Sequence, residues 1–101
     1  MSPSDLTALN QFRSRVFGLI GRALDVDGYH KFHEGRVSVT LPDYFEVLNN
    51  TGRYTVTLDC YVLGPTRRYE WSAHTIPDAL RRAHRDLDRW EFELEGQEAA
   101  S

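Results

Sequence analysis

The sequence predicts a two-layer α+β fold, a four-stranded antiparallel meander with the N- and C-terminal helices packed on one face, in the order α-β-β-β-β-α. Apolar and polar residues alternate strictly over residues 54–60, the pattern of a half-buried strand. Near both chain ends, apolar residues instead recur every three or four positions, as on one face of a helix. Only short loops separate the expected strands, so neighbouring strands run antiparallel. One apolar sheet face and two apolar helix stripes then bury one another in two layers.

Length and composition are those of one globular domain. The chain has 101 residues, of which 41% are hydrophobic and 27% charged. We expect residues 1–95 to fold and residues 96–101 to form a short flexible tail. The absence of a leader-like N-terminus or a long apolar run, and the single cysteine, predict a cytoplasmic protein without disulfides or a membrane partner. Arginine supplies 11 of the 12 basic residues, which we attribute to GC-rich bacterial or phage coding.

The first helix is predicted from its start signal and its apolar stripe. Ser2 is a capping residue, Pro3 fits the first helical position and Asp5 follows three residues after the cap. Arg15 and Arg22 fall on the side of this helix opposite the stripe. The helix is expected to end before Gly28. The stripe consists of Leu6, Leu9, Phe12, Val16, Phe17, Ile20, Ala23 and Leu24.

The sheet is expected to form from four short segments joined by loops. The sequence of residues 29–35 fits either a short edge strand or a loop. A strand near residues 45–48 would place Phe45 opposite Val56 on the core face. The expected strands cover residues 36–41, 45–48, 53–62 and 67–73.

The last two of these strands form the clearest hairpin. A four-residue loop over residues 63–66 places Leu58 opposite Trp71, so that both arms are apolar on one face. The same register places Asp59 opposite Glu70. Two like charges across a strand pair are unfavourable, so this pairing needs an explanation.

A capping box predicts the start of the second helix, with Thr75 as the cap and Asp78 reaching back. Phe92 departs from the apolar stripe of this helix, which indicates either a dimer contact or a distorted last turn. The stripe consists of Ile76, Ala79, Leu80, Ala83, Leu87, Trp90 and Leu94.

The sheet face away from the helices is the first candidate binding surface. Tyr44, Leu48 and Tyr61 are large enough to anchor a partner, and Arg53 and Arg68 on the same face are typical interface residues. The alternative is an ordinary solvated face, since scattered exposed apolar residues are normal.

A strip of arginines on the second helix is the other candidate. It could dock an acidic protein or a phosphate backbone. Aspartates interleaved with the arginines favour a solvated face instead, with pairs such as Arg82 with Asp86 and Arg85 with Asp88. The strip consists of Arg81, Arg82, Arg85 and Arg89.

Signals for catalysis or metal binding are weak. Asp59 with Glu70 is a candidate acid–base or metal pair, but an open sheet face lacks a pocket that excludes water. His30 and His33 would point to opposite faces of a strand, and no second ligand pair follows them. Cys60 lies on the expected core face, where it acts as a small hydrophobe. We therefore expect no enzyme and no cofactor.

The order of helix, strands and helix resembles that of the double-stranded RNA-binding domain. That family opens its last helix with a lysine cluster. Here the same place is Thr75-Ile76-Pro77-Asp78-Ala79, which has no lysine and carries a carboxylate. The resemblance therefore stops at the order of elements, and we assign no family from it.

These observations favour a small non-enzymatic interaction module that binds another protein, such as an accessory protein, inhibitor, adaptor or assembly factor. A homodimer is a further option. The first alternative is a nucleic-acid-binding protein that uses the arginine strip, although the net charge of −3 argues against bulk nucleic-acid binding. The second is a small metal-dependent enzyme.

Overall fold

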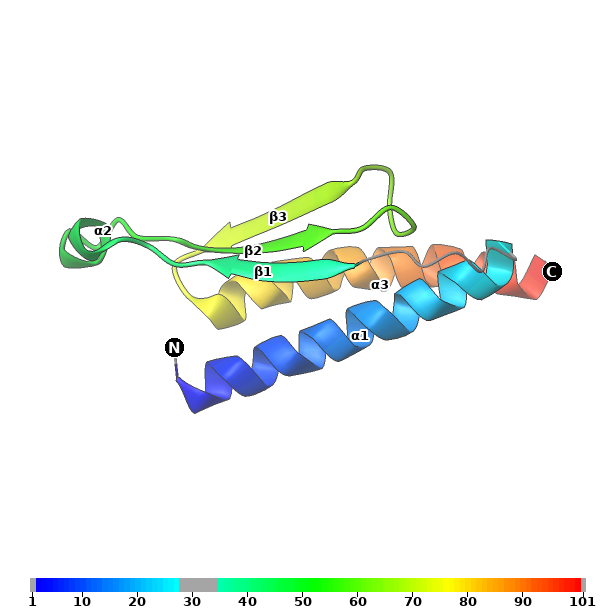
Figure 1. Cartoon of the computed structure of the whole chain (residues 1–101), viewed down its shortest axis with the longest axis horizontal. Helices are drawn as coiled ribbons and strands as arrows, with labels where there is room; N and C mark the ends of the chain where they lie inside the picture. The colour runs from blue at the N-terminus through cyan, green and yellow to red at the C-terminus, as the bar shows by residue number, and fades with distance from the viewer. Residues whose placement is uncertain (1, 28–34, 101) are drawn as a thin grey trace.

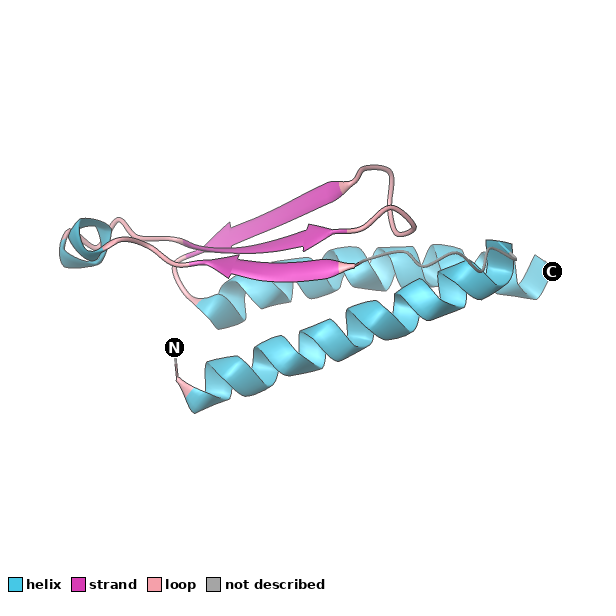
Figure 2. Ribbon diagram, viewed as in Figure 1, coloured by secondary structure: helices cyan, strands magenta, loops and turns pink. Residues whose placement is uncertain are grey.

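Two long helices lie side by side under one face of an antiparallel sheet (Figure 1). The computed structural model describes residues 2–27 and 35–100. Within this part of the chain the sheet has three strands in the order β1-β2-β3, and a one-turn helix interrupts the connection from β1 to β2 (Figure 2). The elements are α1 (Pro3–Asp27), β1 (Arg36–Thr40), α2 (Tyr44–Leu48), β2 (Tyr54–Asp59), β3 (Arg68–Ala73) and α3 (Ile76–Ala100).

The helices are much longer than the strands that they support. Each of the two has 25 residues, which corresponds to about 37 Å, whereas strands of five or six residues span only about 20 Å. The described part of the chain therefore measures 52 × 25 × 23 Å, with a radius of gyration of 15.2 Å. A compact domain of this length has a radius of gyration near 13 Å. None of the described helices is long and apolar enough to cross a membrane.

The α+β class, the terminal helices and the antiparallel sheet are confirmed, but the strand predicted at residues 45–48 is wrong. That segment belongs to α2. The Asp43 carboxylate accepts a hydrogen bond from the Glu46 amide at 2.8 Å, which caps the helix, and the Asn49 amide donates to the Phe45 carbonyl at 3.0 Å. Strand β1 pairs directly with β2, so Val39 and not Phe45 lies opposite Val56.

The hairpin of β2 and β3 keeps its predicted faces but not its predicted register. Leu58 lies opposite Tyr69, and Trp71 lies opposite Val56. This is a shift of two residues, which leaves each side chain of β2 and β3 on its predicted face because side chains alternate with a period of two.

The shift has a cause in the loop between the strands. The loop covers residues 60–67 instead of four residues, because the Tyr69 hydroxyl donates to the Leu63 carbonyl at 3.0 Å and accepts from the Thr66 amide at 2.7 Å. Leu63, which the prediction placed in the hairpin loop, is buried.

The predicted opposition of Asp59 and Glu70 is therefore wrong. Asp59 faces Arg68 and accepts a hydrogen bond from it at 2.8 Å. Glu70 lies opposite Thr57 instead. The like-charge pair disappears in the real register.

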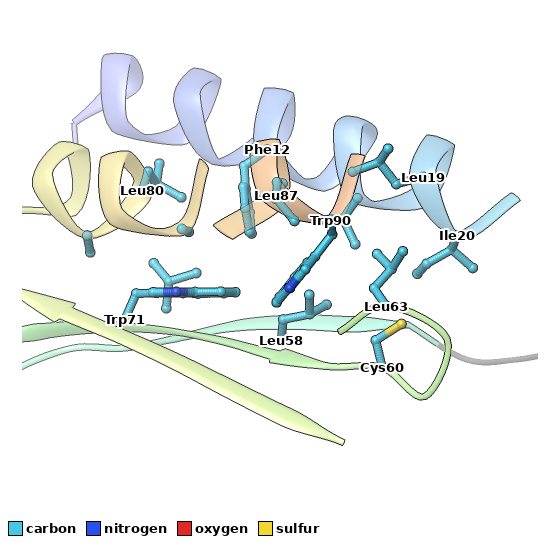
Figure 3. Packing of buried hydrophobic residues seen from close by; sticks show 14 of the residues in the cluster. Phe12, Leu19, Ile20, Leu58, Cys60, Leu63, Trp71, Leu80, Leu87 and Trp90 are labelled. Atoms are coloured by element: carbon cyan, nitrogen blue, oxygen red, sulfur yellow. The ribbon is translucent and has the colours of Figure 1, made fainter. Parts of the chain in front are cut away.

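The core lies between the sheet and the two helices (Figure 3). Trp71 packs among aromatic rings, with Phe12 edge-on at 6.0 Å and Tyr69 stacked at 6.1 Å between ring centroids. Its indole N–H donates to the Asp86 carboxylate at 2.7 Å. The seven predicted stripe residues of α3 are all buried, whereas in α1 Leu6 and Phe17 are exposed and Leu19, which the prediction omitted, is buried.

Arg15 and Arg22, which the prediction placed on the side of α1 opposite its apolar stripe, form ion pairs with α3. Both reach across to α3, where Arg15 binds Asp88 at 2.5 Å and Arg22 binds Glu98 at 2.5 Å. The partner numbers rise together, so the two helices run parallel, as Figure 1 also shows. Burial of the α1 stripe against α3 brings the flanking arginines to the acidic end of α3.

Helix α3 itself continues through Ala100, so residues 96–100, predicted to form a flexible tail, belong to the helix.

His84 lies half-buried in the same interface. Its ring contacts Phe12 edge-on, and its Nδ1 atom accepts from the Arg15 guanidinium at 2.8 Å, because arginine can only donate. Burial, and then the charge of Arg15, lower the pKa of His84, although Asp88 acts in the opposite direction. The folded protein therefore favours the neutral ring.

This arrangement predicts a stability loss at mildly acidic pH. The pKa of histidine in the unfolded chain is about 6.5, so below this pH the unfolded chain binds a proton that the folded protein binds less readily. The stabilisation is complete above about pH 6.5 and is lost progressively as the pH falls from that value to the lower pKa of His84 in the folded protein. We expect the melting temperature to fall less between about pH 7.5 and 5.5 in His84→Gln, which keeps an acceptor for Arg15 but does not titrate. Equal pH dependence in both proteins would contradict the prediction.

Candidate functional site

A cluster of exposed apolar side chains surrounds α2. We call Leu41, Tyr44, Phe45, Val47 and Leu48 the apolar tip. Each side chain of the tip is 54–73% exposed, and α2 has no buried residue. Figure 1 shows α2 beyond the ends of β1 and β2 and clear of both long helices. Five large apolar residues on one projection form a patch, unlike the single exposed apolar residues that are common on protein surfaces.

The backbone of the tip is closed by its own hydrogen bonds. The amides of Thr51 and Gly52 both donate to the Glu46 carbonyl, at 2.9 and 3.1 Å. Asn50 adopts a positive φ of 55°, which asparagine tolerates better than most residues. Gly52 lies so close to Pro42 that a Cβ atom there would come within 2.7 Å of the proline Cβ. The tip is thus a defined structure on the connection between β1 and β2.

Beside the base of the tip is a cationic cleft. We give this name to the shallow hollow of about 420 Å³ lined by Arg53, Arg81, Arg82, Arg85, Ala73, His74 and Asp78. Four arginines against the single carboxylate of Asp78 give the cleft a formal charge of +3 with neutral histidine. The whole chain has a net charge of −3, so the cleft is opposite in sign to the molecule.

Contacts within the protein hold three of these arginines. Arg53 and Arg82 both donate to the Ser72 carbonyl, at 3.2 and 3.0 Å. Arg81 forms an ion pair with Asp78 at 2.7 Å.

Arg85 has no ion-pair partner within residues 2–27 and 35–100. The predicted pairs of Arg82 with Asp86 and of Arg85 with Asp88 do not form.

His74 joins the cleft to the tip. It lines the cleft and also a smaller hollow of about 140 Å³ that includes Pro42, Val47 and Gly52. Its Nδ1 atom lies 3.4 Å from the Gly52 carbonyl oxygen. The apolar tip and the cationic cleft therefore form one continuous surface at one end of the molecule.

The structure separates the remaining predicted site residues from this surface. Arg89 forms an ion pair with Asp86 at 2.7 Å and does not line the cleft. Arg68 pairs with Asp59, next to the loop that joins β2 and β3. Tyr61 lies in that loop, exposed, with the Arg67 guanidinium over its ring at 4.7 Å. The predicted sheet-face surface of Tyr44, Leu48, Arg53, Tyr61 and Arg68 is thus divided between different parts of the molecule.

Sequence reasoning missed part of the tip. The strand predicted at residues 45–48 places Phe45 in the core, although the spacing of Asp43 and Glu46 is that of a helix-capping box. That signal was available, but Pro42 before it also suits a turn. No comparable signal in the sequence pointed to His74 as the link between cleft and tip.

The described residues form no group of three or more His, Cys, Asp or Glu side chains that could hold a metal ion. His30 and His33 lie outside the described residues. Cys60 is buried, as predicted.

Comparison with known proteins identifies no relative, since no family model, no curated protein and no solved structure matches this chain. The surfaces themselves must carry the functional argument.

Proposed function

We propose that this chain is a non-enzymatic protein-binding module that inserts its apolar tip into an apolar pocket of a partner protein. The observation that carries the proposal is the complete absence of buried residues from α2, although four of its five residues are apolar or aromatic. Burying one Leu or Phe side chain fully is worth about 1.5–3 kcal/mol. A partner that covers the tip would gain several such contributions at once.

The length of the connection supports the same proposal. Thr40 and Thr55 are paired across β1 and β2, and a hairpin needs only about two to five residues to join such strands. Residues 41–53 are used instead, and their apolar side chains contribute nothing to the core. Loops that are longer than the fold requires commonly serve binding.

Site-specific photo-cross-linking tests the proposal. A photoreactive amino acid at Phe45 is expected to form one covalent adduct with a protein in lysate of the source cells, and the same amino acid at Phe92 is the control. Phe92 is 77% exposed but lies on α3, outside the tip. Equal adducts from both positions, or none from Phe45, would contradict the proposal.

The purified partner then allows a quantitative prediction. Tyr44→Ala with Phe45→Ala should weaken binding by at least about 30-fold, which is the effect of losing a binding hot spot of about 2 kcal/mol. The melting temperature should stay within about 2 °C of the parent protein, because exposed side chains contribute little to stability. Unchanged affinity would exclude the tip as the anchor.

A nucleic-acid-binding function is the second candidate, favoured by the four arginines that line the cationic cleft. It predicts an affinity that falls steeply with salt concentration, unlike that of an apolar anchor. Two carboxylates weigh against nucleic-acid binding, that of Asp43, which caps α2, and that of Glu46 within α2. They would repel a phosphate backbone that continued from the cleft onto the tip.

A further inference from the structure

We propose that the cationic cleft binds a carboxylate-rich segment of the same partner protein whose pocket takes the apolar tip. The partner would then present an apolar pocket bordered by Asp or Glu side chains. This inference rests on the proposed function, and it adds the chemistry that the partner must have. The cleft is the recognition site for that chemistry.

The charge of the cleft is the first reason. Four guanidinium groups converge on one hollow and Asp78 neutralises only one of them, although the chain as a whole is acidic. Like charges held close together repel one another, and an anionic ligand removes that repulsion. Such a local field also attracts an acidic partner during the encounter.

The second reason is that two of the arginines are already positioned. The Cys60 amide donates to the Arg67 carbonyl at 2.9 Å, so these two residues form a hydrogen-bonded pair of the antiparallel ladder. Hydrogen-bonded and non-hydrogen-bonded pairs alternate along such a ladder, which makes Thr55 and Ser72 a non-hydrogen-bonded pair. The Ser72 carbonyl therefore points away from β2, to the sheet edge. Arg53 and Arg82 both bind that carbonyl.

One shared acceptor uses few of the available donors. Each guanidinium has five N–H donors, so in both arginines most of them have no acceptor among residues 2–27 and 35–100. Their planar forks fit a carboxylate with two parallel hydrogen bonds. The cleft is therefore prepared to bind carboxylates at little cost in side-chain entropy.

The third reason is the continuity with the tip. Because His74 lines both the cleft and the hollow beside Val47, a single partner surface can cover both regions. A protein segment can place apolar side chains over the tip and acidic side chains over the cleft. A nucleic acid cannot vary its backbone charge in this way and would meet Asp43 and Glu46.

The test uses the full chain and two defined probes, a capped hexaglutamate peptide and single-stranded hexathymidylate. Backbone amide NMR signals are followed at about 20 mM salt, where surface charges are weakly screened. We expect hexaglutamate to shift the signals of residues 73–85 and to bind more tightly than hexathymidylate. In Arg81→Glu with Arg85→Glu the affinity for hexaglutamate should fall at least about tenfold, because two attractive contacts become repulsive.

The matched control is Arg13→Glu with Arg67→Glu, which changes the net charge equally at exposed residues outside the cleft. It should change the affinity less than about threefold, since distant surface charges are partly screened. Melting temperatures of both variants verify that they are folded.

Three results would overturn the inference. They are no shift at residues 73–85, tighter binding of hexathymidylate in the cleft, and self-association of the chain that the Arg81→Glu/Arg85→Glu variant abolishes. If Phe45 forms the cross-link but hexaglutamate does not bind in the cleft, only this inference is overturned. A cleft that binds hexaglutamate without any cross-link from Phe45 would instead overturn the proposed function.

Discussion

Replacement of Trp71 by alanine is expected to lower the free energy of unfolding by about 3–5 kcal/mol, the usual cost of removing a buried aromatic side chain. Trp71 is only 7% exposed and contacts the rings of Phe12, Tyr69 and Trp90. Its indole N–H also binds Asp86, which connects β3 to α3. For a domain of this length, such a loss corresponds to a decrease of more than about 12 °C in the melting temperature.

Two further variants make this result interpretable. Phe92→Ala removes an aromatic ring that is 77% exposed on α3, and it should change stability by less than about 0.5 kcal/mol. Trp71→Phe keeps most of the buried ring and loses the hydrogen bond to Asp86, so its effect should fall between the two. If Trp71→Ala unfolded at the temperature of the parent protein, the helices would have to cover the other face of the sheet.

Gly64→Ala is expected to destabilise the fold by about 2–4 kcal/mol, from a left-handed backbone and lost hydrogen bonds. Gly64 has a φ of 69°, a region that an alanine side chain disfavours. A Cβ atom there would overlap the Tyr69 hydroxyl and approach the Trp90 ring to 2.8 Å. Because that hydroxyl holds both Leu63 and Thr66, moving it would release the loop between β2 and β3.

Gly18→Ala is the matched control for this substitution. Gly18 lies on the exposed side of α1, where an added Cβ would meet no described atom within 4 Å apart from its chain neighbours and the local helix backbone. Alanine in a helix interior is favoured over glycine by about 0.5–1 kcal/mol, so this variant should be more stable than the parent protein. Thermal unfolding of both proteins measures the two changes. A neutral Gly64→Ala would mean that the loop does not depend on the Tyr69 hydroxyl.

Together, the tip and cleft experiments separate two levels of recognition. The tip variants measure an apolar anchor, which contributes through buried area, and the cleft variants measure charge, which contributes to the choice of partner and the association rate. A partner that depends on both should lose affinity in each double variant. Only the cleft variant should change the salt dependence of binding.

The local patterns in the sequence were reliable where one segment alone decides its own structure. The capping residues Ser2 and Thr75 each accept the hydrogen bond expected of them, from Asp5 and Asp78. The apolar stripe of α3 is buried throughout, and the period-two alternation placed Trp71 on the core face. These features depend on helix and strand periodicity, which neighbouring segments do not change.

Segment 45–48 shows where such patterns fail. Phe45 and Val47 are two residues apart, which suits one face of a strand as well as two positions of a short helix. The Asp43 cap and the direct pairing of β1 with β2 removed the place that a fourth strand would have occupied. The apolar tip exists because this segment forms a capped helix outside the sheet instead of a fourth strand within it.

The sequence by itself determined the fold class, the two helices and the buried face of the sheet, because these follow from periodicity and capping within single segments. Only the tertiary structure decided the strand register, the exposure of α2 and the gathering of Arg53 with Arg81, Arg82 and Arg85. Those features depend on contacts between different elements of the fold, such as the pairing of β1 with β2 and the Ser72 carbonyl with two arginines. Contacts of that kind form only when the whole chain has folded, and the candidate binding surface consists of them.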